Sequence, residues 1–241
     1  MTKMEKLEKN WDELGKIDPL WAISNSPEKK GGKWSVNEFF ETGIEEIGAI
    51  IKYIKSLGVN TSHSRALDFG CGVGRISQAL ANHFDMVCGV DIAPSMIDLA
   101  KKYNRYGEKC HYYLNEADNL KLFNDDYFDF IYSIITLQHI PPEYSWKYLK
   151  EFLRILAPQG LLIFQVPDEP SLSSSVRQIL GRLKAKFSGH PIIEMYEMKR
   201  DEVIKFVVKN GGRIVDIVRD TATGPDWRSL RYCVTKRYTL R

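Results

Sequence analysis

The amino-acid sequence predicts an α/β domain of the doubly wound type, built on a mostly parallel sheet of seven strands. From residue 64 onward, short apolar segments typical of buried strands alternate with amphipathic helical segments. A glycine-rich turn follows the first of these strands. Alternation at this spacing implies parallel strands joined by right-handed crossovers. The last two strands are expected to form a hairpin that adds an antiparallel C-terminal edge strand.

Residues 1–60 are expected to form a helical cap or lid. Pro27 and two glycines predict a loop over residues 24–33. Between Val36 and Gly58, apolar residues recur at steps of three and four, which is typical of a helix with one buried face. The tryptophans of this segment either close over a bound cofactor or form the cap's own core; they are Trp11, Trp21 and Trp34.

The sheet is predicted to lie in a second domain, residues 61–241. Its strands are expected at residues 66–69, 86–90, 111–114, 128–133, 161–166, 213–218 and 231–235. Helices are expected at residues 75–84, 94–103, 144–156 and 201–210. Residues 168–198 fall outside this alternation and are interpreted as an insertion that contains a helix.

Composition excludes several classes of protein. The 241 residues include 34 Lys and Arg against 31 Asp and Glu, a net charge of +3 that does not indicate a nucleic-acid or membrane-surface binder. No apolar run reaches the length of a membrane span, and the charged first ten residues do not resemble a signal peptide. Four cysteines without metal-site spacing favour a reducing, cytoplasmic setting with neither a disulfide framework nor a bound metal.

The turn after the first strand carries the strongest functional signal. Gly70, Gly72 and Gly74 would allow a ligand to approach the backbone, and the following helix would present unpaired amides to an anionic group. Asp91 ends the second strand, where a carboxylate can accept hydrogen bonds from ribose hydroxyls. We therefore expect a nucleoside with an anionic tail, although a turn that simply requires glycine would give the same pattern.

Two side chains at this turn bear on which nucleoside is bound. Arg75 stands where a dinucleotide-binding turn would have its third glycine. Asp68 would repel a pyrophosphate but could receive an ammonium group. Both features favour a nucleoside that carries an amino acid over a nicotinamide dinucleotide, which would instead make the protein an oxidoreductase.

Five segments resemble motifs of the class I S-adenosylmethionine-dependent methyltransferases, small-molecule enzymes of type 11 or 12 among them. The segments are residues 67–74, 89–96, 115–120, 127–133 and 156–160. The sequence departs from the family pattern at Asn115 and Gln159, where glycine is usual, and at Glu116, whose acid is one methylene longer. The resemblance covers residues 64–166, becomes weaker toward the end of the chain, and implies a Rossmann-like fold.

The resemblance also implies residue roles for S-adenosylmethionine, whose product is S-adenosylhomocysteine. The glycines would line the methionine moiety, and Asp68 would hold its ammonium directly or through water. Asp91 would bind the ribose diol. The remaining expected contacts are Ile92 and Met96 on the adenine ring, Glu116 and Ala117 at the adenine edge, and Ser133 beside the sulfonium.

We expect the methyl acceptor to be a small molecule, with transfer to a hydroxyl. His139 follows the fourth strand, where the family places residues that face the acceptor, and is the candidate general base. Its alternative role is to hydrogen-bond loop backbone and shape the pocket. The segment around Pro141 and Pro142 lacks the signature of base-amine methylation, so a tRNA or other nucleic-acid substrate is a secondary hypothesis.

The insertion is expected to help form the acceptor site. Its basic residues suit an anionic acceptor, or else they are a solvated charged helix face; they are Arg177, Arg182, Lys184 and Lys186. A non-catalytic module that only binds S-adenosylmethionine is the remaining alternative function. The identity of the acceptor and the oligomeric state are not predicted.

Overall fold

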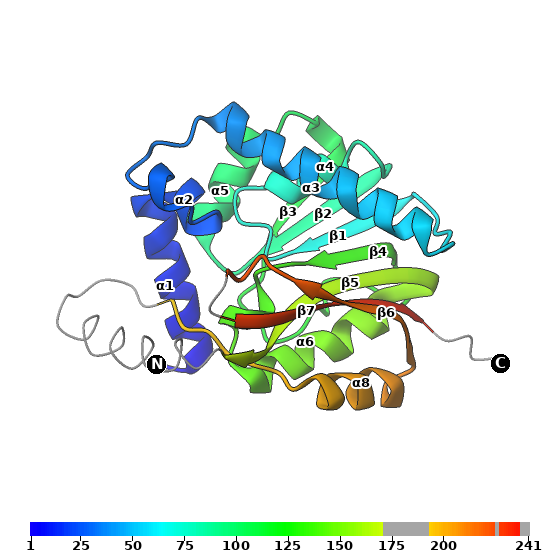
Figure 1. The fold of residues 1–241 in the computed structure, drawn as a ribbon. Helices are drawn as coiled ribbons and strands as arrows, with labels where there is room; N and C mark the ends of the chain where they lie inside the picture. Colours follow the sequence, from blue (N-terminus) through cyan, green and yellow to red (C-terminus); the bar gives the residue numbers. More distant parts are fainter. Residues whose placement is uncertain (171–192, 225–226, 237–241) are drawn as a thin grey trace. The chain divides into compact units, whose positions relative to one another are not determined.

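The computed structural model describes residues 1–170, 193–224 and 227–236 (Figure 1). The strands are β1 (Arg65–Phe69), β2 (Met86–Asp91), β3 (Cys110–Leu114), β4 (Phe128–Ser133), β5 (Leu156–Pro170), β6 (Gly212–Asp220) and β7 (Trp227–Lys236). The α-helices are α1 (Lys3–Ile17), α2 (Pro19–Ile23), α3 (Val36–Ser56), α4 (Arg75–Leu80), α5 (Pro94–Tyr103), α6 (Pro142–Ile155) and α8 (Arg200–Lys209). Short 3-10 turns lie at Pro27–Lys29, Gly107–Lys109 and Leu137–His139.

The seven predicted strands form one mixed sheet in the order β3-β2-β1-β4-β5-β7-β6. β1 and β2 are parallel, as are β2 and β3. β7 is antiparallel to both β5 and β6, which confirms the predicted C-terminal hairpin. Because β7 lies between its two partners, β6 is the outermost strand at that edge.

Several element boundaries differ from those predicted. α4 ends at Leu80 rather than at residue 84. β5 is longer at both ends than its predicted residues 161–166. At its C-terminal end, the pairing with β7 continues as far as Pro170 and Trp227. The predicted helix of the insertion and its four basic residues lie outside the described residues.

Contacts divide the chain into two compact units. The first holds Met1–Glu116 with Phe128–Phe130, and the second holds Ala117–Tyr127 with the described residues from Ile131 onward. In the first unit α3 runs alongside α4, as Figure 1 shows, and their approach is close. A Cβ on Gly43 of α3 would lie 2.6 Å from the carbonyl oxygen of Arg75. The N-terminal helices thus belong to the same unit as β1, β2 and β3.

Apolar and thiol groups fill the interior around these strands. In the described part of the chain, no helix is long and apolar enough to cross a membrane. All four cysteines are buried and free. Burial raises the pKa of the Cys88 and Cys233 thiols to about 12 and that of Cys110 to about 11, so these groups are neutral packing atoms at physiological pH.

Candidate functional site

The glycine turn between β1 and α4 is tied to the end of β2. The amides of Gly70 and Cys71 both donate to the carbonyl oxygen of Val90, at 2.8 and 3.0 Å. Gly72 and Gly74 have φ angles of 51° and 84°, in the region that side chains disfavour. A Cβ at either position would also collide with a neighbour. At Gly72 it would lie 2.5 Å from Cδ1 of Ile23.

Asp91 holds this turn from the end of β2. Its Oδ2 accepts a 2.8 Å hydrogen bond from the Gly72 amide, and its Oδ1 accepts one of 2.9 Å from the Ala93 amide. Burial raises the pKa of Asp91, and the backbone amides act in the opposite direction. Each carboxylate oxygen keeps a second lone pair. The group can therefore order the turn and still accept a hydrogen bond from a ligand hydroxyl.

Asp68 of β1 is buried just before the glycine turn. Its side chain is 3% exposed and accepts a 2.6 Å hydrogen bond from the hydroxyl of Ser77 in α4. Burial raises the pKa of Asp68 to about 7, against the lowering effects of the Ser77 hydrogen bond and the charge of Arg75. Burial at this level leaves Asp68 little surface for a direct ligand contact.

Arg75, at the position of a dinucleotide site's third glycine, is engaged by α3. Its guanidinium forms a 2.8 Å ion pair with Glu46 and lies 3.4 Å from the Thr42 hydroxyl. The side chain is thus directed to the helix that packs on α4. This contact explains why an arginine is accommodated at the start of α4.

The predicted adenine contacts in the first unit differ in exposure. Ile92 is half-buried and Glu116 is exposed. Met96 is 1% exposed and belongs to a buried apolar cluster with residues of α2 and α3. Asn115 stands where the family usually has glycine. Its backbone amide donates a 2.9 Å hydrogen bond to the carbonyl oxygen of Asp91. That residue therefore continues the ladder between β2 and β3 without a need for glycine.

In the second unit, helix α6 holds the loop that follows Glu116. The Tyr148 hydroxyl donates a 2.6 Å hydrogen bond to the carbonyl oxygen of Ala117. Lys147 forms a 2.5 Å ion pair with Asp118. The backbone of the predicted adenine-reading segment is thus fastened to one face of α6.

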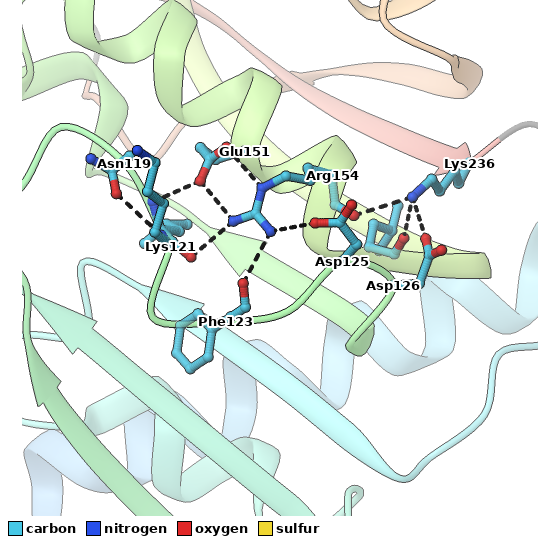
Figure 2. Close-up of polar contacts among 10 residues, drawn as sticks. Asn119, Lys121, Phe123, Asp125, Asp126, Glu151, Arg154 and Lys236 are labelled. Carbon is cyan, nitrogen blue, oxygen red and sulfur yellow. Dashed lines mark hydrogen bonds and ion pairs between the residues drawn. The ribbon is translucent and has the colours of Figure 1, made fainter.

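Arg154 and Glu151 complete this attachment, as Figure 2 shows. Glu151 accepts the Leu120 amide at 2.8 Å and two guanidinium hydrogen bonds at 2.9 and 2.8 Å. Arg154 also donates to the carbonyl oxygens of Leu120 and Phe123 and to the Asp125 carboxylate, at 2.9, 3.0 and 2.7 Å. The Arg154 hydrogen bonds lower the pKa of Glu151. Sequence reasoning missed this clamp, whose only signal was an acid and an arginine three positions apart.

His139 lies at the end of the turn that follows β4. It is 7% exposed, its Nδ1 lies 2.8 Å from the carbonyl oxygen of Glu194, and its Nε2 lies 3.0 Å from the Gln138 amide nitrogen. Because a carbonyl can only accept, Nδ1 carries the proton and Nε2 accepts from Gln138. Burial lowers the pKa of His139 to about 4. The imidazole is therefore neutral at physiological pH.

A buried glutamine supports the same turn. Gln165 of β5 is fully buried and donates to the Gln138 side-chain oxygen at 3.1 Å, and to the Ser229 hydroxyl. Its own oxygen accepts the Ile135 amide at 2.9 Å. Ile135 has a φ of 59°, which is costly for a β-branched residue. Gln165 thus holds a strained backbone just beyond Ser133, whose side chain is fully buried.

Residues 67–164 match a family model described as a methyltransferase domain. Over these residues the chain resembles a methyltransferase domain. The match begins in β1 and ends in β5, so it includes the glycine turn, Asp91 and the α6 clamp.

Curated relatives resemble the methyltransferase domain and its surroundings. A ubiquinone biosynthesis O-methyltransferase of Coxiella burnetii is 32% identical over 117 residues, which is 47% of each chain. A 2-methyl-6-phytyl-1,4-hydroquinone methyltransferase of Synechocystis is 25% identical over 154 residues, or 64% of this chain and 47% of that protein. The chain thus aligns with about half the length of these relatives.

Solved structures identify the fold of the chain. Magnesium protoporphyrin IX methyltransferase from Synechocystis PCC 6803, solved with bound SAH, superposes with a TM-score of 0.69 at 18% identity, over 98% of this chain and all of that one. A Leishmania major S-adenosylmethionine-dependent methyltransferase superposes with a TM-score of 0.65 at 16% identity, over 96% of this chain and 82% of that one. The fold is that of the class I methyltransferases.

Proposed function

We propose that this protein transfers a methyl group from S-adenosylmethionine to a small-molecule acceptor. The observation that carries the proposal is the glycine turn ordered by Asp91, inside a segment that matches the methyltransferase domain. In-line transfer needs a donor and an acceptor held in alignment, and an ordered turn at the end of parallel strands is suited to hold the donor.

The cofactor contacts that we propose are those that the family resemblance implies. Gly70, Gly72 and Gly74 would line the methionine moiety, and Asp91 would accept the ribose hydroxyls. Asp68, being buried, would act through water or through the turn rather than by direct contact. Ile92, Glu116 and Ala117 would contact the adenine. Met96 and Ser133 are as buried as Asp68 and would shape the adenine and sulfonium ends of the site from within.

We further propose that the acceptor atom is a hydroxyl oxygen. Support comes from the Coxiella relative, whose name describes an O-methyltransferase. A small-molecule acceptor agrees with the names of the two curated relatives, one of which refers to ubiquinone biosynthesis and the other to a substituted hydroquinone. Nucleic acid remains the secondary acceptor class.

For His139 we propose the pocket-shaping role rather than the role of general base. Both ring nitrogens have hydrogen-bond partners, and a pKa of about 4 makes the imidazole a weak proton acceptor at neutral pH. A phenolic acceptor would then lose its proton to solvent or to another group as the methyl transfers.

Calorimetric titration tests the cofactor assignment. We expect S-adenosylmethionine and S-adenosylhomocysteine to bind with micromolar affinity and NADH not to bind. Asp91→Ala should weaken cofactor binding by about 1–3 kcal/mol, because the turn amides and the ribose lose their acceptor. Asp98→Ala removes an exposed carboxylate of α5 and should leave affinity unchanged. Binding of NADH without S-adenosylmethionine would overturn the proposal.

Turnover separates an enzyme from a module that only binds. Labelled S-adenosylmethionine should be converted to S-adenosylhomocysteine with a panel of phenolic and quinol-type acceptors, and the label should appear in an ether. Cofactor binding without transfer to any small molecule or to nucleic acid would favour the binding-module alternative.

A further inference from the structure

Helix α1 lies on the first turn of α5, immediately beyond Asp91. The Asp12 carboxylate accepts a 2.8 Å hydrogen bond from the Ser95 amide, and the Ser95 hydroxyl donates to the Asp12 carbonyl oxygen at 3.0 Å. The N-cap residue of α5 is Ala93, which has no capping side chain. Asp12 therefore supplies the acceptor that α5 lacks locally.

The Asp12 carboxylate is charged when it makes this contact. Burial acts to raise its pKa, but hydrogen bonds from Lys16 and Ser95 together lower the pKa below the usual value. A charged acceptor at the first turn of a helix also complements the helix dipole. This contact is accordingly stronger than an exposed hydrogen bond between neutral groups.

α1 and α5 approach so closely that a side chain at Gly15 of α1 would collide with α5. A Cβ on Gly15 would lie 2.3 Å from Oγ of Ser95 and 3.4 Å from Cε of Met96. The backbone of α1 therefore lies directly against the first turn of α5, which carries Met96, one of the proposed cofactor contacts.

α2 makes a second contact, with the glycine turn. Leu20 and Ala22 belong to the same buried cluster as Val73, Ala93 and Met96. Trp11 and Trp34 pack against this cluster, so at least these two tryptophans contribute to its packing. Ile23, at the end of α2, is half-buried, and its Cδ1 lies over Gly72.

We propose that α1 and α2 form one wall of the cofactor site, with Asp12 as a positioning residue for residues 91–96 and Ile23 as a contact to the methionine end. The proposal rests on the proposed function. Asp12 forms hydrogen bonds with Ser95. Through Ser95 it positions residues 91–96, which include Asp91 and Met96. Ile23 covers the glycine backbone along which the methionine moiety would lie. Without Asp12, the cofactor must order this turn on binding, which costs affinity.

Titration of variants with S-adenosylmethionine tests the proposal. Asp12→Ala should weaken binding by about tenfold, the loss expected for one charged hydrogen bond. Asp12→Asn retains an oxygen that can accept the Ser95 amide and should stay within about threefold of the wild type. Glu13→Ala removes the neighbouring carboxylate and should bind as the wild type does.

Two further variants keep the test independent of folding. Ile23→Ala shortens a half-buried side chain and should weaken binding about threefold to tenfold, with an unfolding midpoint close to that of the wild type when no cofactor is present. Ser95→Ala removes only the neutral hydrogen bond from its hydroxyl to the Asp12 backbone carbonyl, whereas Asp12→Ala removes the charged acceptor of the Ser95 amide. Ser95→Ala should therefore lie between the wild type and Asp12→Ala. Hydrogen exchange of residues 95–97 should be faster in Asp12→Ala.

The outcomes separate this inference from the proposed function. If the wild type fails to bind S-adenosylmethionine, the proposed function is overturned. If the wild type binds and folded Asp12→Ala and Ile23→Ala bind equally well, the wall is overturned and the function stands. Equal losses in Asp12→Ala and Asp12→Asn would exclude the positioning role of the Ser95 hydrogen bond.

Discussion

The Nε2 atom of His139 and the side-chain amide nitrogen of Gln138 lie 3.0 Å apart, and Gln138 in turn receives a hydrogen bond from Gln165. A histidine expected to exchange protons with a substrate is thus part of a hydrogen-bonded chain of buried side chains. The chain joins the turn after β4 to the interior of β5 and to Ser229 of β7. Each side chain in this hydrogen-bonded chain restrains its neighbours. The arrangement therefore affects how stability depends on pH and which role His139 can have in turnover.

The first prediction concerns the stability of the His139 network toward acid. An unfolded histidine titrates near pH 6.5, whereas the pKa of His139 in the fold is about 4. Between these values the unfolded state binds more protons, so stability rises with pH through this window and is lost as pH falls. The effect is on the order of 3 kcal/mol. Urea unfolding at pH 4.5 and pH 7 should show a smaller difference for His139→Asn than for the wild type.

Turnover by the same variant distinguishes the two roles of His139. Asn can still donate to the Glu194 carbonyl oxygen, so we expect His139→Asn to retain most of kcat, and His139→Ala to lose more. A loss of about 10²–10⁴-fold in kcat for His139→Asn, with cofactor affinity intact, is the signature of a lost general base and would contradict the pocket-shaping role.

A second prediction concerns the buried carboxyl of Asp68. The pKa of this group is near 3.8 when unfolded and about 7 in the fold. Between these values the folded state binds more protons, so ionisation of Asp68 makes stability fall as pH rises from about 4 to about 7. Asp68→Asn is neutral and can still accept the Ser77 hydroxyl. Between pH 5 and pH 8, the unfolding free energy of Asp68→Asn should rise by on the order of 3 kcal/mol relative to that of the wild type. If the difference between variant and wild type is the same at both pH values, the carboxyl is in a more solvated setting.

The third prediction concerns the clamp formed by Arg154. Arg154→Lys keeps the charge but loses the planar set of donors that reaches Glu151, Asp125 and two carbonyl oxygens. We expect a loss of about 1–3 kcal/mol in unfolding free energy and weaker cofactor binding, measured by urea unfolding and calorimetry. Lys150→Ala, at an exposed position of the same helix, should change neither.

The fourth prediction separates backbone strain from crowding at Gly72. Gly72→Ala should destabilise the fold and weaken cofactor binding, because the residue has a positive φ and its Cβ would collide with Ile23. In the double variant with Ile23→Ala the collision is removed and the strain remains. A double-mutant cycle on unfolding free energy should therefore recover part of the loss, and full additivity would show that Ile23 does not crowd the turn.

The sequence predicts the parts of the fold that depend on local pattern. Alternating strands and helices, the glycine turn, and the hairpin of β6 and β7 are all confirmed, since each follows from apolar periodicity or turn residues close together in the chain. The C-terminal end of β5 extends beyond the predicted residue 166 because it pairs with β7 as far as Pro170. That pairing depends on a strand about 60 residues later and leaves no mark on the local pattern.

The candidate site shows the same division. The placement of Gly72 beside Asp91 was predictable because a strand–turn–helix unit brings the carboxyl ends of β1 and β2 together. The contact between Asp12 and Ser95 was not, since it joins residues 83 positions apart through a single carboxylate. The neutral state of His139 also depends on burial and on Glu194, which lies in a segment expected only to be part of an insertion.

Cys71 lies within the glycine turn, and its thiol donates to the Gly72 carbonyl oxygen at 3.6 Å. Burial, together with the charges of Asp91 and Asp68, raises the pKa of this thiol well above its usual value. Under the proposed function, the turn would lie beside a sulfonium, which alkylates thiolates. Because Cys71 remains a protonated thiol, it is a poor nucleophile. Under that function, a buried sulfur atom would lie close to an alkylating agent and would be protected from methylation by its own protonation.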